Sequence, residues 1–150
     1  MSLRSLSRPL SVGVRTMTVS AVGRGMKSIA SCGPHHVMTV DEPFNMGGTD
    51  SGPHPLAAVF AGILGSGQAT AAMVAHEYCL PIKSIDWSVT SDVDMSHFMC
   101  GGDADPLPMH SVRVKARVAG PLSDDQMELL SHAVSARCPC AALLSRVGGT

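Results

Sequence analysis

Two cysteines separated by one proline are the residues of this chain whose type and spacing most clearly suggest chemistry. Cys138 and Cys140 flank Pro139 and follow Arg137, directly before a short helix predicted over residues 141–145. The first turn of a helix stabilises a thiolate through the helix dipole, and a neighbouring arginine adds positive charge. The segment could therefore hold a redox pair, half of a metal site, or two buried and unreactive cysteines.

Each of these interpretations meets a physical limit. A direct disulfide across Cys-Pro-Cys is strained, and a zinc site needs further ligands, for which the chain offers no clean second pair. His35 and His36 are expected in a strand, where adjacent side chains point to opposite faces. His54 and His76 lie at opposite ends of a predicted helix, too far apart to bind one ion. We therefore expect surface or packing histidines.

A long apolar helix must organise the rest of the chain. The segment from Leu56 to Ala75 is 20 residues long and carries no charge, and its large apolar residues recur at helical spacing. This length would also span a bilayer. Only seven of these residues are large and apolar, however, and the others are small or polar. We therefore expect a helix that is buried on every side in a soluble core.

The flanking segments predict an antiparallel sheet. Alternating side chains indicate strands at residues 12–19, 26–31 and 36–40 before the helix, and at 85–90 and 112–118 after it. Residues 94–108 are rich in Gly, Pro and Asp and predict a loop. Ser123 and Gln126 have the spacing of a capping box at the start of another helix. The order of elements predicts an α+β fold in which the helices cover one face of the sheet.

Composition limits the partners and the compartment. The chain has 150 residues and a net charge of −1, which favours a single domain over residues 12–150 and gives no indication of nucleic acid or an anionic membrane. Five scattered cysteines do not resemble a disulfide framework, so we expect an intracellular, cytoplasmic protein. Residues 1–11 contain Arg4, Arg8 and several serines without an acidic residue, which is typical of a flexible leader or a transit peptide. The mitochondrial matrix is therefore the alternative compartment.

Four short motifs occur in the order in which one protein family carries them. They are Gly23-Arg24-Gly25, Asp41-Glu42-Pro43 followed by Gly47-Gly48, Gly52-Pro53-His54-Pro55-Leu56 before an Ala-rich helix, and Arg137-Cys138-Pro139. In these motifs the chain resembles the osmotically inducible protein C and organic hydroperoxide resistance family (OsmC/Ohr). The resemblance implies an OsmC-like fold, in which an antiparallel sheet wraps around a long central helix in an intertwined homodimer. It also implies a role in oxidative-stress defence.

The family's chemistry is thiol peroxidation. A cysteine of the central helix attacks a hydroperoxide, an arginine holds it as thiolate, a glutamate fixes the arginine, and a second cysteine resolves the sulfenic acid as a disulfide. By resemblance, Arg24 occupies the arginine position and Cys138 that of the resolving cysteine. The reactive-cysteine position falls on Ser66, or on Gly67 if the register shifts by one, and the glutamate position on Leu56. The family's final strand is also absent from the sequence.

Ser66 cannot run this cycle. An alcohol is almost never ionised near pH 7, and its oxygen cannot pass through sulfenic acid and disulfide states. No G-x-S-x-G motif surrounds Ser66, which argues against a serine hydrolase. Ser66 could thus be a small packing residue, and Arg24 could bind an anion or lie in a surface turn.

Three functions are compatible with these residues, and none requires a cofactor. The first is an OsmC-like homodimer without peroxidase activity that binds a small hydrophobic or oxidised ligand in an apolar cleft at the dimer interface, near Ser66 and Arg24. The second is an enzyme with peroxiredoxin activity, a hydroperoxide reductase that uses Cys138 or Cys140 and a dithiol reductant. The third is a metal-binding role for Cys-Pro-Cys. We expect neither nucleic acid nor a membrane as partner.

Overall fold

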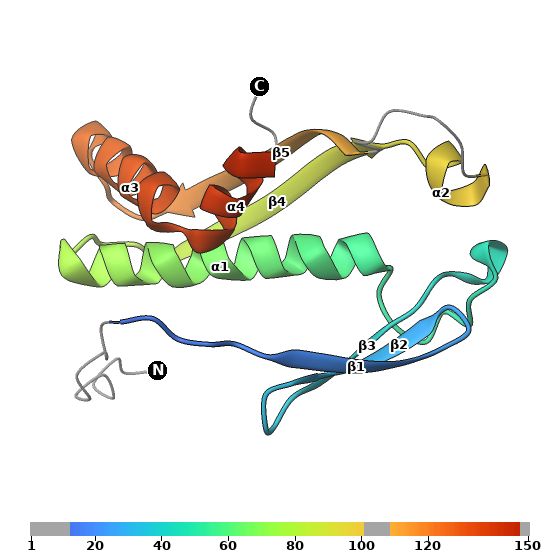
Figure 1. The fold of residues 1–150 in the computed structure, drawn as a ribbon. Helices are drawn as coiled ribbons and strands as arrows, with labels where there is room; N and C mark the ends of the chain where they lie inside the picture. Colours follow the sequence, from blue (N-terminus) through green and yellow to red (C-terminus); the bar gives the residue numbers. More distant parts are fainter. Residues whose placement is uncertain (1–12, 101–108, 148–150) are drawn as a thin grey trace. The chain divides into compact units, whose positions relative to one another are not determined.

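The computed structural model describes residues 13–100 and 109–147, so the leader predicted at residues 1–11 lies outside the described residues. The chain divides into two compact units, Met1–Pro55 and Leu56–Thr150. The first unit contains a three-stranded sheet. The second contains the long helix α1, a two-stranded sheet and three further helices (Figure 1). Each predicted strand and helix has a counterpart, but the strands form two sheets instead of one.

The first unit is an antiparallel meander of β1 (Val19–Arg24), β2 (Lys27–Cys32) and β3 (Val37–Val40). Arg24 pairs with Lys27 across a tight turn, in which Gly25 has a φ of 59°, a conformation that favours glycine. The first strand begins at Val19, so its predicted start at residue 12 is wrong. Residues 13–18 pair with no described strand, so the alternating side chains of this segment do not form one.

The loop that follows β3 is held together by Asp41. The Asp41 carboxylate accepts hydrogen bonds from the backbone N–H and the hydroxyl of Thr49, at 3.1 and 2.6 Å, and from the same two groups of Ser51, at 3.2 and 2.9 Å. The bond from the Thr49 hydroxyl is the main reason why the pKa of Asp41 lies well below its usual range. A Cβ at Gly48 would lie 1.8 Å from the carbonyl oxygen of Glu42. The DEP and Gly-Gly motifs therefore build a closely packed loop, which includes the short helix η1 (Phe44–Met46).

The second unit contains α1 (Pro55–Glu77), β4 (Ser84–Val93), α2 (Ser96–Cys100), β5 (Met109–Ala119), α3 (Asp124–Arg137) and α4 (Pro139–Val147). Strands β4 and β5 form a long antiparallel ribbon, and α2 lies at the end of the ribbon away from α3 (Figure 1). Helix α2 corrects the prediction of a loop over residues 94–108. Asp94 starts the helix by accepting hydrogen bonds from the N–H and the hydroxyl of Ser96, and residues 101–108 lie outside the described residues.

One face of α1 forms the core of the second unit. Gly67, Thr70, Ala71 and Val74 are buried on this face, and Ala71 and Val74 pack with Leu80 and Leu130. The expectation of a helix buried on every side is wrong for the single chain, because the residues that pack against it come from β4, β5, α3 and the adjoining loops and converge on one side. The opposite face is exposed and carries small residues at four-residue intervals, namely Ala57, Ala61, Gly65 and Ala69.

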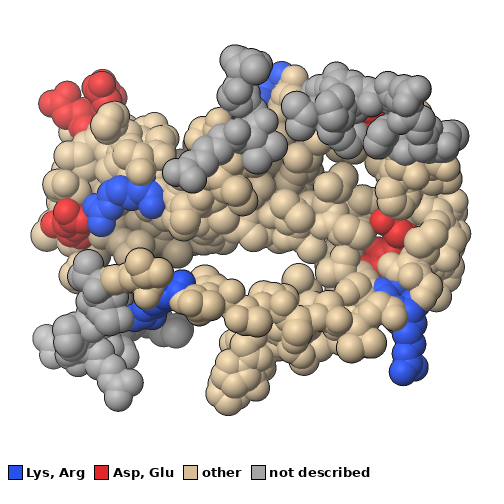
Figure 2. Space-filling model, viewed as in Figure 1, with Lys and Arg blue, Asp and Glu red and all other residues tan. Residues whose placement is uncertain are grey.

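By length and composition, α1 is also apolar enough to cross a membrane. The core helix of a globular protein meets the same criteria, and one face of α1, with Ala71 and Val74, packs in the core of the second unit. Charged side chains are few on the face of the molecule shown in Figure 2 and stand there in small, separate groups. Uncharged residues therefore dominate the visible surface.

Helix α3 begins with the predicted capping box. The Gln126 N–H donates to the Ser123 hydroxyl at 3.3 Å, and the Ser123 N–H donates to the Gln126 side chain at 3.0 Å. The helix continues through Arg137, which is its last residue. The prediction that Arg137 opens the last helix is therefore wrong. Cys138 is the single residue between the two helices. Pro139 is the first residue of α4, where its missing N–H costs nothing.

Candidate functional site

The structure brings together two of the predicted site residues. Ser66 lies in the middle of α1, and Cys138 lies 72 residues later between α3 and α4. The Ser66 Oγ and the Cys138 Sγ are 3.3 Å apart, and either atom can be the donor. The position that the resemblance assigned to the reactive cysteine therefore faces the position assigned to the resolving cysteine.

The surroundings of Cys138 favour its thiolate. The side chain is 4% exposed, and burial alone raises the pKa of the thiol. Hydrogen bonds from the Ser66 hydroxyl and from the N–H groups of Ala141 and Cys140 outweigh burial, so the pKa of Cys138 lies below its ordinary value. The two N–H groups are free to point at the sulfur because the first turn of α4 has no helical acceptors for them.

Arg137, which was expected to stabilise the Cys138 thiolate, forms an ion pair with Glu77. Its Nη1 lies 2.5 Å from the Oε2 of Glu77 at the end of α1, and this hydrogen bond raises the pKa of Arg137. The groups that lower the pKa of Cys138 are neutral hydrogen-bond donors. The expectation that Arg137 stabilises the thiolate is therefore wrong, because its charge is paired with Glu77.

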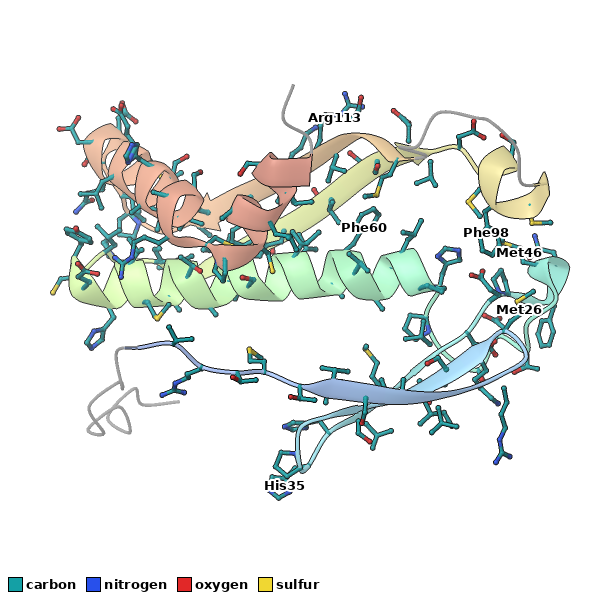
Figure 3. All side chains as sticks on the ribbon, in the orientation of Figure 1. Met26, His35, Met46, Phe60, Phe98 and Arg113 are labelled. Carbon is teal, nitrogen blue, oxygen red and sulfur yellow. The ribbon has the colours of Figure 1, made fainter. Side chains whose placement is uncertain are left out.

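A cavity of about 370 Å³ lies beside Cys138 within the second unit. Its wall is mostly apolar, and the described lining residues, which come from α1, β4, β5, α3, Cys138 and α4, include no charged residue. The lining residues are Ile63, Gly67, Ala71, Ile85, Trp87, Val114, Ala116, Val118, Met127, Leu130, Ser131, Val134, Ser135, Cys138, Ala141 and Leu144. Figure 3 shows Phe60, one turn of α1 before Ile63, pointing toward the β4–β5 ribbon.

Gly67 and Trp87 shape this cavity together. A Cβ at Gly67 would lie 3.1 Å from the Trp87 ring, so glycine lets the ring lie against α1. The Trp87 Nε1 donates to the Gln68 side chain at 2.8 Å, which fixes the orientation of the ring. Gly67, the other candidate for the reactive-cysteine position, thus faces Trp87, whereas Ser66 faces Cys138.

The remaining predicted residues have other positions. Cys140 lies in the first turn of α4, is partly buried and is free, as are Cys32, Cys79 and Cys138. Arg24 is the last residue of β1 in the first unit and is exposed. Within residues 13–100 and 109–147, no group of three or more His, Cys, Asp or Glu is placed to hold a metal ion. The expected cleft at a dimer interface near Ser66 and Arg24 stays a prediction.

The histidines correct one further expectation. His35 and His36 lie in the loop between β2 and β3 and not in a strand, and Figure 3 shows His35 at the tip of this loop. The Cys32 N–H bonds to the His36 carbonyl at 2.8 Å and closes the loop around Gly33, whose φ is 81°. The His54 Nε2 lies 3.2 Å from the Glu42 Oε2.

Sequence reasoning missed Thr70 and Trp87 as site residues. Thr70 follows Ser66 by four residues, so the helical spacing alone could have placed both hydroxyls on one face. The Thr70 hydroxyl donates its single proton to the Ser66 carbonyl at 2.9 Å, and Thr70 thus stands one turn of α1 from Ser66 beside the Cys138 thiol. No such local signal exists for Trp87, because it meets α1 only through the tertiary fold.

Comparisons with known proteins show the fold to be OsmC-like. No protein-family model matches the sequence, and no curated protein is significantly similar to it. Among solved structures, an OsmC-like protein from Mycoplasma pneumoniae superposes with a TM-score of 0.74 at 21% identity and covers 89% of each chain.

Two organic hydroperoxide resistance proteins superpose as well. The protein from Elizabethkingia anophelis, with crystallant-derived thiocyanate bound, has a TM-score of 0.66 at 15% identity over 91% of this chain and 92% of its own. A protein from Vibrio cholerae, described as a putative member of this class with captopril bound in one of the active sites, has a TM-score of 0.63 at 17% identity over 95% and 90%. The predicted α+β class and the resemblance to OsmC/Ohr proteins are confirmed at the level of the fold.

Proposed function

We propose that this chain is an OsmC/Ohr-like oxidative-stress protein that binds a small apolar compound beside Cys138 and lacks the family's two-cysteine peroxidase cycle. The observation that carries the proposal is the contact of 3.3 Å between the Ser66 hydroxyl and the Cys138 sulfur, beside a mostly apolar, partly open cavity. The pair has the arrangement of two redox partners, but one of its atoms is oxygen. A sulfenic acid cannot form at Ser66, and no disulfide can follow.

The cavity supports the ligand-binding part of the proposal. Its volume of about 370 Å³ falls within the usual range for small-molecule sites, roughly 300–1,000 Å³, and such sites combine apolar walls with a few polar groups. Here the polar groups are Ser131, Ser135 and the Cys138 sulfur. The absence of charge among the lining residues favours a neutral ligand over an anion. The captopril and thiocyanate in the two bacterial structures support the idea that proteins of this fold admit small molecules.

The single tryptophan makes ligand binding measurable. Trp87 lines the cavity and is the only tryptophan in the sequence, so its fluorescence reports on occupancy directly. We expect octan-1-ol to change the emission in a saturable manner. Ala116→Phe fills the cavity from β5 and should weaken binding by about tenfold or more, roughly 1.4 kcal/mol. Ala119→Phe, on the same strand but outside the lining, is the matched control and should bind normally. A linear response in the wild type, or equal effects of both variants, would contradict the proposal.

The peroxidase part has its own test. With cumene hydroperoxide and a dithiol reductant, we expect no turnover by the wild-type protein, because Ser66 cannot enter the cycle. Turnover that disappears in Cys138→Ser would contradict this expectation. It would favour the second function, a hydroperoxide reductase that uses Cys138.

The homodimer is part of the same proposal. The small exposed residues on the outer face of α1, at positions 57, 61, 65 and 69, would let a second helix approach closely. We expect light scattering to give the mass of a dimer. Ala61→Glu should shift the protein to monomer, whereas Ala136→Glu, on the exposed side of α3, should not. A monomeric wild type would overturn this assignment.

A further inference from the structure

The cavity contains a nucleophile that the proposed ligand binding does not use. Among the described lining residues Cys138 is the one cysteine, and hydrogen-bond donors from Ser66 of α1 and from the first turn of α4 lower the pKa of its thiol. A thiolate is the reactive form of cysteine toward electrophiles. The thiolate form of Cys138, on the wall of a partly open and mostly apolar cavity, can react with a compound that enters the cavity. The chemistry available at this sulfur therefore decides which class of ligand the site suits.

We propose that Cys138 captures a small apolar α,β-unsaturated aldehyde or ketone as a covalent thioether in this cavity. The inference rests on the proposed function, because it requires the cavity to accept the alkyl tail of the compound. Ile63, Trp87 and Leu130 provide apolar surface for that tail. The uncharged lining selects a neutral carbonyl compound over a charged one.

The reaction needs no other reactant than water. The Cys138 Sγ attacks the β-carbon, a sulfur–carbon bond forms, and the π electrons of the carbon–carbon double bond move toward the carbonyl oxygen to give an enolate. The α-carbon then takes up one proton, which Ser66 can deliver from its hydroxyl 3.3 Å from the sulfur and recover from water. The proton gained balances the one that the thiol lost on ionisation. Nothing is oxidised or reduced by an external agent.

The partner atom of the sulfur favours a carbon electrophile over an oxidant. Attack on a peroxide would leave a sulfenic acid, which needs a second thiol to continue. The side-chain atom in contact with the Cys138 Sγ is the Ser66 oxygen, and it cannot supply that thiol. Addition to a carbon–carbon double bond is complete in one step. An alcohol beside the sulfur is then useful, because it can donate a proton.

Mass spectrometry of the full-length protein after incubation with non-2-enal tests the inference. We expect one adduct, mapped to the peptide that contains Cys138. It should be lost in Cys138→Ser and retained in Cys79→Ser, a control at an exposed cysteine outside the cavity. The rate of adduct formation at Cys138, divided by the rate of N-acetylcysteine with the same compound, should be severalfold higher for non-2-enal than for but-2-enal. Ala116→Phe should remove this dependence on chain length. Labelling mainly at any of the other four cysteines, or a rate that follows N-acetylcysteine at every chain length, would overturn the inference.

A competition experiment on the wild type keeps the test independent of variants that fail to fold. Octan-1-ol, which has no electrophilic carbon, should slow the formation of the non-2-enal adduct at the concentration that saturates the Trp87 signal. Saturable octan-1-ol binding without any adduct would overturn the covalent step and leave the proposed function standing. If octan-1-ol produces no Trp87 signal and no competition, the proposed function itself fails.

Discussion

The buried side chains of Asp41 and Cys138 differ in what surrounds them, although similar hydrogen-bond donors lower the pKa of both. Each side chain is nearly inaccessible to solvent, and hydroxyl and backbone N–H donors lower the pKa of each. The donors to Asp41 come from one short loop of the first unit. Those to Cys138 come from α1 and α4, which are far apart in the sequence.

The decisive difference is free space. Around Asp41, the loop is so compact that a Cβ at Gly48 or Gly52 would collide with backbone atoms at 1.8 or 2.4 Å. Beside Cys138 lies an apolar cavity of about 370 Å³. A fully surrounded anion can only stabilise the fold, whereas an anion that borders a cavity can also react. The same kinds of hydrogen-bond donor therefore stabilise the fold at Asp41 and favour a reactive sulfur at Cys138.

The largest effect should come from removing the charge of Asp41. Asp41→Asn turns an acceptor of several hydrogen bonds into a side chain with its own donors, which face the N–H groups and hydroxyls of Thr49 and Ser51. We expect the thermal midpoint to fall by several degrees. Asp50→Asn, at an exposed position in the same loop where φ is 51°, should leave it unchanged, since Asn tolerates this conformation. Equal midpoints for the two variants would contradict a structural role for Asp41.

Acid should remove the same contribution. The pKa of Asp41 is lower in the folded state than in the unfolded chain, where it is about 3.9. The contribution is therefore fully present well above pH 4 and is lost as the pH falls through the folded-state value. The difference in stability between the wild type and Asp41→Asn should narrow as the pH decreases below about 4. Denaturant melts over this range measure it, and a constant difference would contradict the assignment.

Cys138 should react with alkylating agents at a lower pH than an ordinary cysteine. Because the pKa of Cys138 is lowered, its reaction with iodoacetamide should reach half of its plateau rate below about pH 8.5, the value for a free thiol. Ser66→Ala removes the strongest of the hydrogen bonds and should move this midpoint upward. Peptide mass spectrometry reports each cysteine separately. A midpoint that Ser66→Ala leaves in place would show that the hydroxyl does not hold the thiolate.

A smaller effect should follow from narrowing the cavity at Gly67. In Gly67→Ala, the new Cβ would lie 3.1 Å from the Trp87 ring, so the ring must shift. We expect severalfold weaker octan-1-ol binding by Trp87 fluorescence, with little change in stability because alanine gains about 0.8–1.0 kcal/mol of helix propensity. Gly62→Ala is the control, since nothing lies within 4 Å of its Cβ position. This variant should gain stability and bind normally, and equal binding by both variants would exclude Gly67 from the cavity wall.

Features with a local cause could be predicted from the sequence. The order of strands and helices follows from side-chain periodicity, and the capping box of α3 follows from Ser123 and Gln126 alone. Helix α2 escaped prediction because the bonds of Asp94 to Ser96 start a helix of only five residues in a stretch rich in Gly and Pro.

Features that depend on distant contacts could not be predicted in the same way. Local periodicity showed an apolar α1, but not that its partners all pack on one side. The pairing of Arg137 with Glu77 joins the ends of two helices and could not be read from the neighbourhood of Arg137. The position of Ser66 opposite Cys138 was expected only through resemblance to a family, since nothing near either residue indicates the other.

Disulfide trapping tests the central claim, that Ser66 occupies the position from which a sulfur would meet Cys138. Under mild oxidation with diamide, we expect Ser66→Cys to form a disulfide between the introduced cysteine and Cys138, as mapped by mass spectrometry. Gly67→Cys, whose side chain would point at Trp87, should leave Cys138 free. If Ser66→Cys leaves Cys138 reduced, or if Gly67→Cys forms the bond instead, the assignment of Ser66 is contradicted.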